Sequence, residues 1–388
     1  MSDLSNYINL DYAASTPMRA CAIEAQHRYD MSCLAGVNPN SLHSLGRQAA
    51  QTLEQCRLNI ARSFGQHVRP SEIVFTGGGT EANFIALVGI AEQVRQLDSR
   101  RNRILISAIE HDSVLDNLGH LRNEGFITQL IYPCRDGYIT PDELQAQISD
   151  DVCLVCVMLA NNETGIIQPI RELSSITHDA GAYFMCDAIQ GYMHIPFDVE
   201  DLHVDAMTIA AHKIGGPVNL GVLYLKNRTP LRSQINGGGQ EFGRRAGTQD
   251  VRSVIALDAV IEYLSPDVED EAYRLRQLSN DMYKNLCCHP RIHPTIKDPF
   301  SAHRLPGIVS ITVDGMDSEE LILKLDAKGF CVSAGSACSS GSLDPSHVLS
   351  AMNISRDQAL GSLRISFDDR VDPSSLDLFS KTLLEIVG

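Results

Sequence analysis

The stretch Phe75-Thr76-Gly77-Gly78-Gly79-Thr80-Glu81-Ala82-Asn83 joins the end of an apolar run to the beginning of a helical pattern. Glycines let backbone N–H groups approach a ligand closely, and the N-terminus of a helix favours an anion. The stretch is neither a P-loop nor the dinucleotide fingerprint GxGxxG. It predicts a strand, a turn and a helix, and it leaves open whether the glycines bind a phosphate or only form a tight turn.

Short apolar runs alternate with amphipathic stretches on the C-terminal side of this motif. Helical patterns such as 81–96 and 170–180 lie between most of the candidate strands, which are 73–76, 103–107, 128–131, 152–159, 182–186, 206–210 and 221–224. Buried strands that alternate with helices are typical of a mostly parallel sheet covered on both faces. We therefore expect an α/β fold with a large, mostly parallel, seven-stranded sheet.

The pattern changes at about residue 260. A polar, helix-prone segment (265–286) precedes a run (307–313) that alternates like a half-exposed strand; a helix (318–328), a strand-like run (363–367) and a terminal helix follow. We predict a large cofactor-binding domain over 15–260. Residues 1–14 and 261–388 are expected to form a smaller α/β domain.

Composition limits the classes of function. The 388 residues include 48 acidic and 32 basic ones, and the formal net charge is −16. Such a charge repels phosphate backbones, so direct nucleic-acid binding is not expected, whereas a basic partner protein is compatible with it. The sequence has no secretory signal and no apolar run long enough for a membrane helix. We expect a cytoplasmic protein with no membrane contact.

Eleven cysteines without a signal peptide indicate reduced thiols and not a disulfide framework. The pair Cys153-x-x-Cys156 could suggest zinc or redox chemistry. However, it lies within the apolar run 152–159, and no second CxxC completes a four-sulfur site. We interpret the pair as core residues of a strand and expect no metal site.

Two polar residues follow apolar strands at the positions where open α/β sheets bind ligands. Asp187 ends the run Phe184-Met185-Cys186-Asp187, and it could hold a cationic ring nitrogen or simply cap a helix. Lys213 follows the run 206–210 and precedes Gly-Gly-Pro. A lysine is usually a solvated surface residue, but one partly desolvated at a strand end can react with an aldehyde.

Pyridoxal 5′-phosphate requires three features from its protein. It needs a binding site for its phosphate group, a carboxylate opposite the ring nitrogen and a lysine that reacts with its aldehyde. The glycine-rich turn, Asp187 and Lys213 supply these in chain order. Their combination is far more specific than each part, so the sequence predicts pyridoxal phosphate as the cofactor.

One cysteine lies in a segment of small and polar residues. Cys338 is at the centre of Ser333-Ala334-Gly335-Ser336-Ala337-Cys338-Ser339-Ser340-Gly341-Ser342, which has the least apolar neighbours of any cysteine here. A thiol on an exposed loop can enter a site, react and leave, which a core cysteine cannot. From these residues alone, an incidental loop cysteine and a catalytic one both remain open.

These motifs resemble those of the cysteine desulfurases of the NifS/IscS-like class, which are grouped with the class V aminotransferases. The resemblance extends from Leu10-Asp11-Tyr12-Ala13-Ala14-Ser15-Thr16-Pro17 to Ser362-Leu363-Arg364-Ile365-Ser366. It implies the fold of type I pyridoxal-phosphate transferases, which is also that of aspartate aminotransferase. The segment around Cys338 is similar to the long catalytic loop of the first desulfurase group.

The resemblance implies roles around the cofactor ring. Lys213 is similar to the lysine that binds the cofactor aldehyde, and Asp187 to the partner of the ring nitrogen. Gln190 resembles the contact of the ring hydroxyl. His111 resembles the histidine that stacks on the ring and helps to move protons. Asn162 is similar to a residue that contacts both ring and substrate.

The resemblance also implies residues for the phosphate and the substrate. Gly79, Thr80 and His212 match phosphate ligands. Thr248 resembles the residue that reaches the phosphate of the neighbouring subunit, which implies a homodimer. Arg364 would bind the substrate carboxylate, a role for which a guanidinium is suited because it can form two parallel hydrogen bonds with a carboxylate.

Three departures from the family pattern are visible. The family usually has serine at the position of Ala210, and two of its other motifs read differently here, at Val218 and at Gln240 to Phe242. We also note that the chain reaches Gly388 without the longer tail that docks a scaffold protein in some members. These features suggest a specialised enzyme with its own sulfur acceptor.

The implied reaction removes sulfur from L-cysteine, forms L-alanine and leaves a persulfide on Cys338 for an acceptor protein. The acceptor could serve iron–sulfur clusters, thiolation or DNA phosphorothioate modification. Two rivals use the same cofactor, namely a selenocysteine lyase and an aminotransferase, and the latter needs no loop cysteine. A third alternative is an inactive subunit of this fold that only binds a partner.

Overall fold

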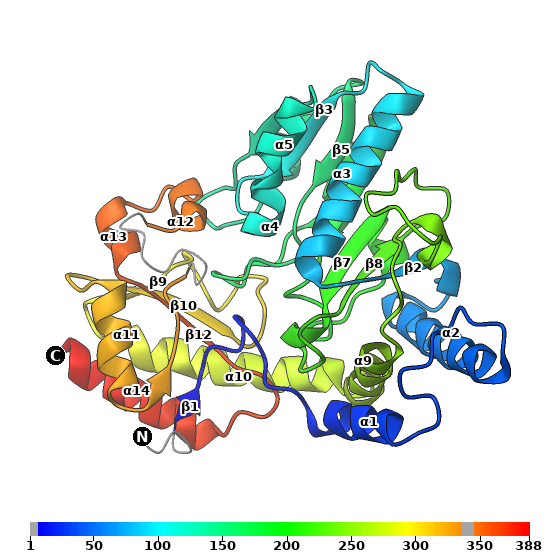
Figure 1. Ribbon diagram of the computed structural model, residues 1–388. Helices are drawn as coiled ribbons and strands as arrows, with labels where there is room; N and C mark the ends of the chain where they lie inside the picture. Colours follow the sequence, from blue (N-terminus) through cyan, green and yellow to red (C-terminus); the bar gives the residue numbers. More distant parts are fainter. Residues whose placement is uncertain (1–6, 336–344) are drawn as a thin grey trace.

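A seven-stranded sheet forms the centre of the computed structural model, which describes residues 7–335 and 345–388 (Figure 1). The strand order is β2-β8-β7-β6-β5-β3-β4. Only β8 runs antiparallel to both of its neighbours, while the other neighbouring strands are parallel. The prediction of a mostly parallel seven-stranded sheet is confirmed.

All seven expected strands form. They are β2 (Ile73–Thr76), β3 (Arg103–Ser107), β4 (Ile127–Ile131), β5 (Val152–Cys156), β6 (Tyr183–Asp187), β7 (Ala206–Ala210) and β8 (Gly221–Leu225). Every residue of β2, β5, β7 and β8 is buried, as expected of strands covered on both faces. Cys153 and Cys156 belong to β5 and are fully buried, in agreement with their interpretation as core residues.

Successive strand residues contribute to two different hydrophobic cores. Ile73 and Phe75 pack in one core with helices α1 (Ala20–Asp30), α2 (Ser44–Phe64), α7 (Ile170–Asp179) and α9 (Val251–Leu264). Val74 lies in the other core, which α3 (Gly79–Leu97), α4 (Asp112–Leu115) and α5 (Asn117–Asn123) cover. Side chains alternate between faces along a strand, so helices cover both sides of the sheet.

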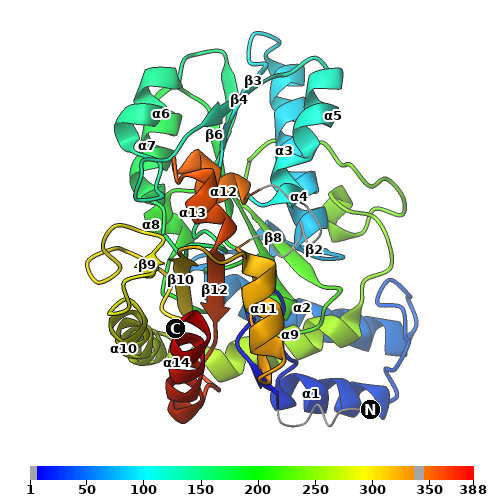
Figure 2. The same ribbon diagram turned by 90° about the vertical axis from the view of Figure 1, so that its left-hand side faces the viewer.

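The C-terminal part of the chain builds a separate three-stranded antiparallel sheet. It consists of β9 (Ile292–Pro294), β10 (Ile308–Val313) and β12 (Ser362–Ser366), with β10 in the middle. Helices α10 (Val268–Leu286), α11 (Ser318–Asp326) and α14 (Pro373–Val387) pack with it around a core of their own (Figure 2). The N-terminal strand β1 (Ile8–Asn9) joins this part of the molecule because it pairs with β11 (Phe330–Cys331).

The remaining helices are short. They are α6 (Pro141–Gln147), α8 (Val199–Leu202), α12 (His347–Ala351) and α13 (Arg356–Leu360), with the 3-10 turns η2 (Pro70–Glu72), η3 (Ala211–Lys213) and η4 (Glu241–Gly243). Val348, Leu349 and Met352 of the α12 region pack against Ile109 and Met158, which follow β3 and β5. Within the described ranges, none of the helices combines the length and the apolar character needed to cross a membrane.

The sequence was misleading at residues 307–313. The alternation of polar and apolar residues predicted a half-exposed strand, but all six residues of β10 are buried. The polar members are satisfied internally, because the Ser310 hydroxyl donates to Thr295 Oγ1 (2.9 Å) and Thr312 Oγ1 accepts from Gln358 Nε2 (3.4 Å). A buried hydroxyl with a partner costs little, so periodicity alone overstated the exposure.

Candidate functional site

The polar residues singled out in the sequence gather where the parallel strands of the large sheet end. Asp187 is the last residue of β6, and Lys213 ends the turn η3 directly after β7. His111 caps α4 after β3. Open α/β sheets bind ligands at this edge, because loops after adjacent parallel strands diverge there.

The Asp187 carboxylate is held rigidly below this edge. Its Oδ2 accepts from Asn83 Nδ2 (2.7 Å) and its Oδ1 accepts from the Ile189 amide (2.9 Å). Asn83 is fixed in turn, since its Oδ1 accepts from the Thr208 hydroxyl (2.6 Å). Burial raises the pKa of Asp187 above its ordinary value, although the two N–H donors, His111 and Lys213 act in the opposite direction. A cation placed beside this carboxyl would therefore stabilise its charged form.

Lys213 and Gln190 meet at one backbone carbonyl of the N-terminal segment. Lys213 Nζ donates to the carbonyls of Ala13 (2.7 Å) and Ala14 (2.9 Å), and Gln190 Nε2 donates to that of Ala13 (2.8 Å). The Thr16 hydroxyl donates to the Lys213 carbonyl (2.8 Å). The segment 13–16 therefore packs directly on the lysine and the glutamine.

A hollow of about 820 Å³ opens beside these residues. The N-terminus of the 19-residue helix α3 faces it through Gly79 and Thr80, together with His111 and His212. The first amides of a helix lack intrahelical partners, so this end of the hollow suits an anion. Gly78 has φ +150°, a conformation that L side chains rarely adopt, which explains one of the three glycines.

The two histidines of the hollow differ in their environments. His111 Nδ1 accepts from the Ser113 amide (3.0 Å), which fixes the imidazole over the start of α4. His212 Nδ1 lies 3.3 Å from the Ser15 hydroxyl. Burial, and to a smaller extent Lys213, lowers the pKa of His212 to about 4, so its imidazole is neutral at pH 7.

Arg364 approaches the site from β12, in the C-terminal sheet. Its Nη1 donates to the Asn162 carbonyl (2.9 Å) and its Nη2 to Asp11 Oδ1 (2.8 Å). The side chain is 2% exposed, yet its Nε has no hydrogen-bond partner among the described residues. A buried guanidinium nitrogen without a partner suits a carboxylate ligand. For Asn162, the contact with Arg364 is made by the backbone carbonyl.

A second buried carboxyl lies next to the first. Glu110 is fully buried, and its Oε1 accepts from the Met158 amide (2.6 Å), while its Oε2 has no partner among the described residues. Burial raises the pKa of Glu110 well above its usual range, and the nearby Asp187 raises it further. Two adjacent buried carboxyls do not both ionise readily, because the charge of one disfavours the charge of the other.

Two predicted residues are not placed with the others. Thr248 is exposed and does not line the hollow that Gly79, Thr80 and His212 share. Cys338 lies outside the described residues, within 336–344. Gly79, Thr80, His111, Asp187, Gln190, His212 and Lys213 are brought to one edge of the large sheet, and Asn162 and Arg364 meet beside it.

Sequence reasoning missed the residues that orient the site from behind. Asn83 was part of the glycine-rich motif, and Asp11 was part of the N-terminal one, but neither had a role. Asn83 is 0% exposed and faces the apolar side of α3, one turn after Thr80. A lone amide on the apolar face of a helix is a signal that could have identified it.

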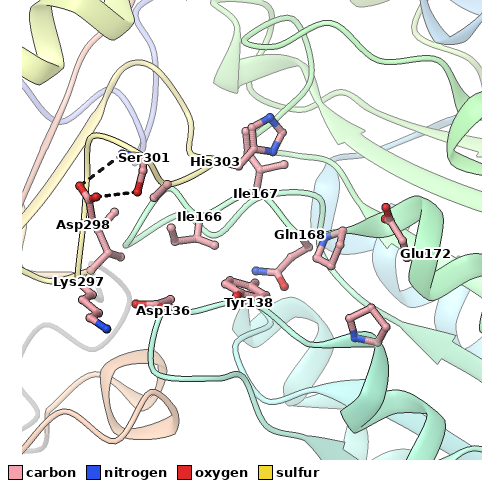
Figure 3. A pocket seen from close by; sticks show the side chains of 14 residues that line it. Asp136, Tyr138, Ile166, Ile167, Gln168, Glu172, Lys297, Asp298, Ser301 and His303 are labelled. Atoms are coloured by element: carbon pink, nitrogen blue, oxygen red, sulfur yellow. Dashed lines mark hydrogen bonds between the residues drawn. The ribbon is translucent and has the colours of Figure 1, made fainter.

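A second hollow, of about 700 Å³, is lined by a different set of residues (Figure 3). Figure 3 shows Ile166 and Ile167 in the middle of the lining, with Asp298 and Ser301 on the left and Glu172 on the right. Both ends of the buried Gln168 amide are satisfied, because Oε1 accepts from the Ile139 amide and Nε2 donates to the Gly137 carbonyl. Of the described residues that were predicted to be catalytic or to bind the cofactor, none lines this hollow. Its chemistry identifies no ligand.

The sequence of this chain matches a known protein family. Residues 8–379 match the family model described as Aminotransferase class-V. A relative from Dictyoglomus turgidum named cysteine desulfurase IscS is 37% identical over 359 residues, which are 92% of this chain and 89% of that protein. The match therefore includes almost all of both proteins.

Solved structures of similar proteins have the same fold. A structure titled NifS-like protein superposes with a TM-score of 0.89 at 30% identity, covering 98% of this chain and 99% of that one. A structure titled SspA in complex with cysteine superposes with a TM-score of 0.80 at 28% identity, covering 93% and 98%. The fold is thus shared with these proteins.

Proposed function

This chain is a member of the class-V aminotransferase family, on its cysteine desulfurase branch, and from that membership we propose how it takes sulfur from L-cysteine. In this proposal L-cysteine becomes L-alanine, and its sulfur is held as a persulfide on Cys338 for an acceptor protein. The supporting observation is the convergence of Lys213, Asp187 and the N-terminus of α3 on one edge of the sheet.

The residues present fit pyridoxal 5′-phosphate. The cofactor, when bound, withdraws electrons from the substrate carbon that loses a proton. Lys213 would hold its aldehyde, and Asp187 its ring nitrogen, because a cation beside this buried carboxyl would stabilise its charged form. Gly79, Thr80 and the neutral His212 would surround its phosphate at the end of α3.

The other groups of the edge would orient the ring and move protons. Gln190 would contact the ring hydroxyl, and His111 would lie over the ring and exchange protons on the substrate side. Lys213 would be the base that takes the proton from the substrate Cα. Its two carbonyl partners, Ala13 and Ala14, place its Nζ at the edge.

Arg364 would bind the substrate carboxylate. Its Nε, which has no partner in the described part of the chain, is the group available for such a ligand, and Asp11 and the Asn162 carbonyl fix the two other nitrogens. A structure titled SspA in complex with cysteine has the same fold at 28% identity, which supports cysteine as the ligand class.

The sulfur transfer balances without an added oxidant. The Cys338 thiolate attacks the sulfur of the bound cysteine, the bond between that sulfur and Cβ breaks, and a sulfur–sulfur bond forms. Cβ takes a proton and becomes the methyl group of alanine. The persulfide then leaves Cys338 for the acceptor.

Product analysis tests this function. Purified protein loaded with pyridoxal phosphate should convert L-cysteine into L-alanine, with no keto acid added, and carry one extra sulfur on Cys338 by mass spectrometry. An aminotransferase would need a keto acid, and a selenocysteine lyase would act on selenocysteine and spare cysteine. An inactive binding subunit would form neither product.

We also propose a homodimer in which Thr248 of each subunit completes the phosphate site of its partner. Its exposure in the single chain supports this, because an exposed hydroxyl is free to face a second copy. Light scattering should give twice the mass of the chain. Mixing inactive Lys213→Ala and Thr248→Ala variants should restore part of the activity if sites are shared, and no restoration would contradict the sharing.

Further proposals concern context. The two units 15–260 and 1–14 with 261–388 would act as separate domains, which the pairing of β1 with β11 supports. We expect a cytoplasmic enzyme whose acceptor protein serves iron–sulfur clusters, thiolation or DNA phosphorothioate modification. The net charge of −16 favours an acceptor with a basic surface over direct contact with nucleic acid.

A further inference from the structure

Glu163 is a buried carboxyl that the proposed chemistry does not use. It is 2% exposed, and it lies in a turn in which the amides of Glu163 and Thr164 both donate to Asn161 Oδ1 (2.9 Å each). Its neighbour Asn162 is the residue whose carbonyl accepts from Arg364. Glu163 is therefore fixed directly beside the group that would bind the substrate carboxylate.

The carboxylate of Glu163 contacts Ser346 and Gly335, which are distant from Glu163 in the sequence but near each other in it. Ser346 Oγ donates to Glu163 Oε2 (2.5 Å). Gly335 approaches the same oxygen so closely that a Cβ built on Gly335 would lie 2.5 Å from it. The stretch between Gly335 and Ser346 contains Cys338. A single oxygen thus meets the described residues at both ends of that stretch.

Arg364 also fixes the N-terminal end of the Cys338 stretch, through backbone hydrogen bonds that do not involve Glu163. The Arg364 amide donates to the Ser333 carbonyl (2.7 Å), and the Ser333 amide donates to the Arg364 carbonyl (3.3 Å). The same residue holds Asn162, next to Glu163, with its guanidinium. Substrate clamp, Glu163 and both ends of the Cys338 stretch therefore form one connected set of contacts.

The surroundings of Glu163 act on its carboxyl in both directions. Burial raises the pKa of Glu163 above its ordinary value, whereas the Ser346 hydroxyl, His347 and Arg364 act in the opposite direction, and Asp112 raises it further. The Ser346 hydroxyl is thus one of the groups that stabilise the charged form of Glu163.

We propose that Glu163 is a positioning residue, which ties Gly335 and Ser346 together and so sets the reach of Cys338 to the sulfur of the bound cysteine. The inference rests on the proposed function, since it gives Cys338 the role of sulfur acceptor. It assigns no chemistry to Glu163 itself, which acts only through the two ends that it joins.

The position of Cys338 affects the transfer of sulfur, but it does not affect the binding of cysteine that precedes the transfer. Misplacing a reacting group by about 1 Å can slow a reaction about 10²-fold. The binding of cysteine depends on Arg364, whose guanidinium donates to Asn162 and Asp11 among the described residues and not to Glu163. The two steps can therefore be separated, because the first changes the visible absorbance of the bound cofactor and the second adds sulfur to Cys338.

The test compares Ser346→Ala with the wild-type holoenzyme after rapid mixing with L-cysteine. We expect an unchanged absorbance response and an unchanged KM, and persulfide formation on Cys338 slowed about 10- to 100-fold in quenched samples. Ser346→Thr, which keeps the hydroxyl, should restore the rate. Gly335→Ala, which forces a methyl group against Glu163 Oε2, should also slow only the sulfur transfer.

Ser355→Ala is the matched control. Ser346 caps α12 by accepting from the Val348 and Leu349 amides, and Ser355 caps α13 by accepting from the Gln358 amide. The control loses a cap without losing a contact to Glu163, and it should keep the wild-type rate. A wild-type rate in both Ser346→Ala and Gly335→Ala overturns the inference alone. A wild-type enzyme that forms no persulfide overturns the proposed function and the inference with it.

Discussion

Arg364 and Asp11, which are 353 residues apart in the sequence, form an ion pair with 2.8 Å between Nη2 and Oδ1. The pair joins the N-terminal segment to the C-terminal sheet, and it leaves the buried Nε of the arginine without a partner among the described residues. Asp11 thereby aims the guanidinium, and the free nitrogen marks where a substrate carboxylate would bind.

Arg364→Lys should raise the KM for L-cysteine and leave cofactor binding unchanged. Lysine keeps the charge but loses the planar fork, so one hydrogen bond to the carboxylate is lost. Such a bond to a charged group contributes about 1.5–3 kcal/mol, which corresponds to about 10- to 100-fold in KM. Steady-state kinetics with alanine detection measures it. Arg304→Lys, a buried arginine whose three nitrogens all bind the protein, should keep the wild-type KM.

Asn83→Asp should weaken the retention of pyridoxal phosphate and move the acid limb of the activity profile to higher pH. The change replaces an N–H donor to Asp187 by an oxygen, so the already raised pKa of Asp187 rises further. A carboxylate with a higher pKa is protonated earlier as the pH falls, and its hold on a cationic ring nitrogen is lost there.

Asn59→Asp provides the control for this change. Asn59 Nδ2 also donates to a carboxylate, that of Asp258 (3.2 Å), but it lies in α2 and outside the site. Its variant should retain the cofactor and keep the pH profile of the wild type. An unchanged acid limb in Asn83→Asp would contradict the role given to Asp187.

Lys213→Ala and Cys338→Ser should fail at different steps. Without Lys213 the protein should lose its yellow colour and form no alanine. Without Cys338 it should keep the cofactor and respond to cysteine in the visible spectrum, yet form no persulfide, because the thiol acts last. Cys33→Ser, at an exposed cysteine, is the control and should form the persulfide normally. A persulfide on another cysteine of Cys338→Ser would reject this assignment.

Ala210→Ser should tighten the retention of pyridoxal phosphate during dialysis. Ala210 is buried, and its Cβ lies 3.2 Å from the position of a Cβ built on Gly79, so a serine hydroxyl there would face the start of α3. One charge-assisted hydrogen bond to phosphate is worth about 1.5–3 kcal/mol, or about one to two orders of magnitude in affinity. Ala211→Ser, in the adjacent core position, should give no gain. Unchanged retention in Ala210→Ser would mean that the phosphate is already saturated.

Arg57→Ala should destabilise the fold by about 3–5 kcal/mol, because it leaves the Glu241 carboxylate buried and unpaired. Arg57 and Glu241 are 1% and 0% exposed, with 2.6 Å between Nη1 and Oε2. Urea unfolding measures the change. Arg252→Ala removes an exposed arginine from its pair with Asp30, and it should cost far less, because solvent screens the pair. An equal loss of unfolding free energy in the two variants would show that burial does not make the Arg57–Glu241 pair more important for stability.

The local sequence determined the strands and the chemistry of their ends. Strands such as β2, β3 and β7 begin and end where the apolar runs do, because a strand buried on both faces must be apolar throughout. The glycine turn, Asp187 and Lys213 were visible for the same reason, since each is a polar or flexible position that directly follows such a run.

Only the tertiary structure decided which distant residues meet. The contacts of Asn83 with Asp187, of Arg364 with Asp11 and of Ser346 with Glu163 join positions that are 104, 353 and 183 residues apart. The burial of β10 was decided in the same way, because its polar residues Ser310 and Thr312 are hydrogen-bonded by Thr295 and Gln358 from other segments. Periodicity and motifs record what a residue needs locally, whereas the choice of partner depends on how the sheets and helices pack together.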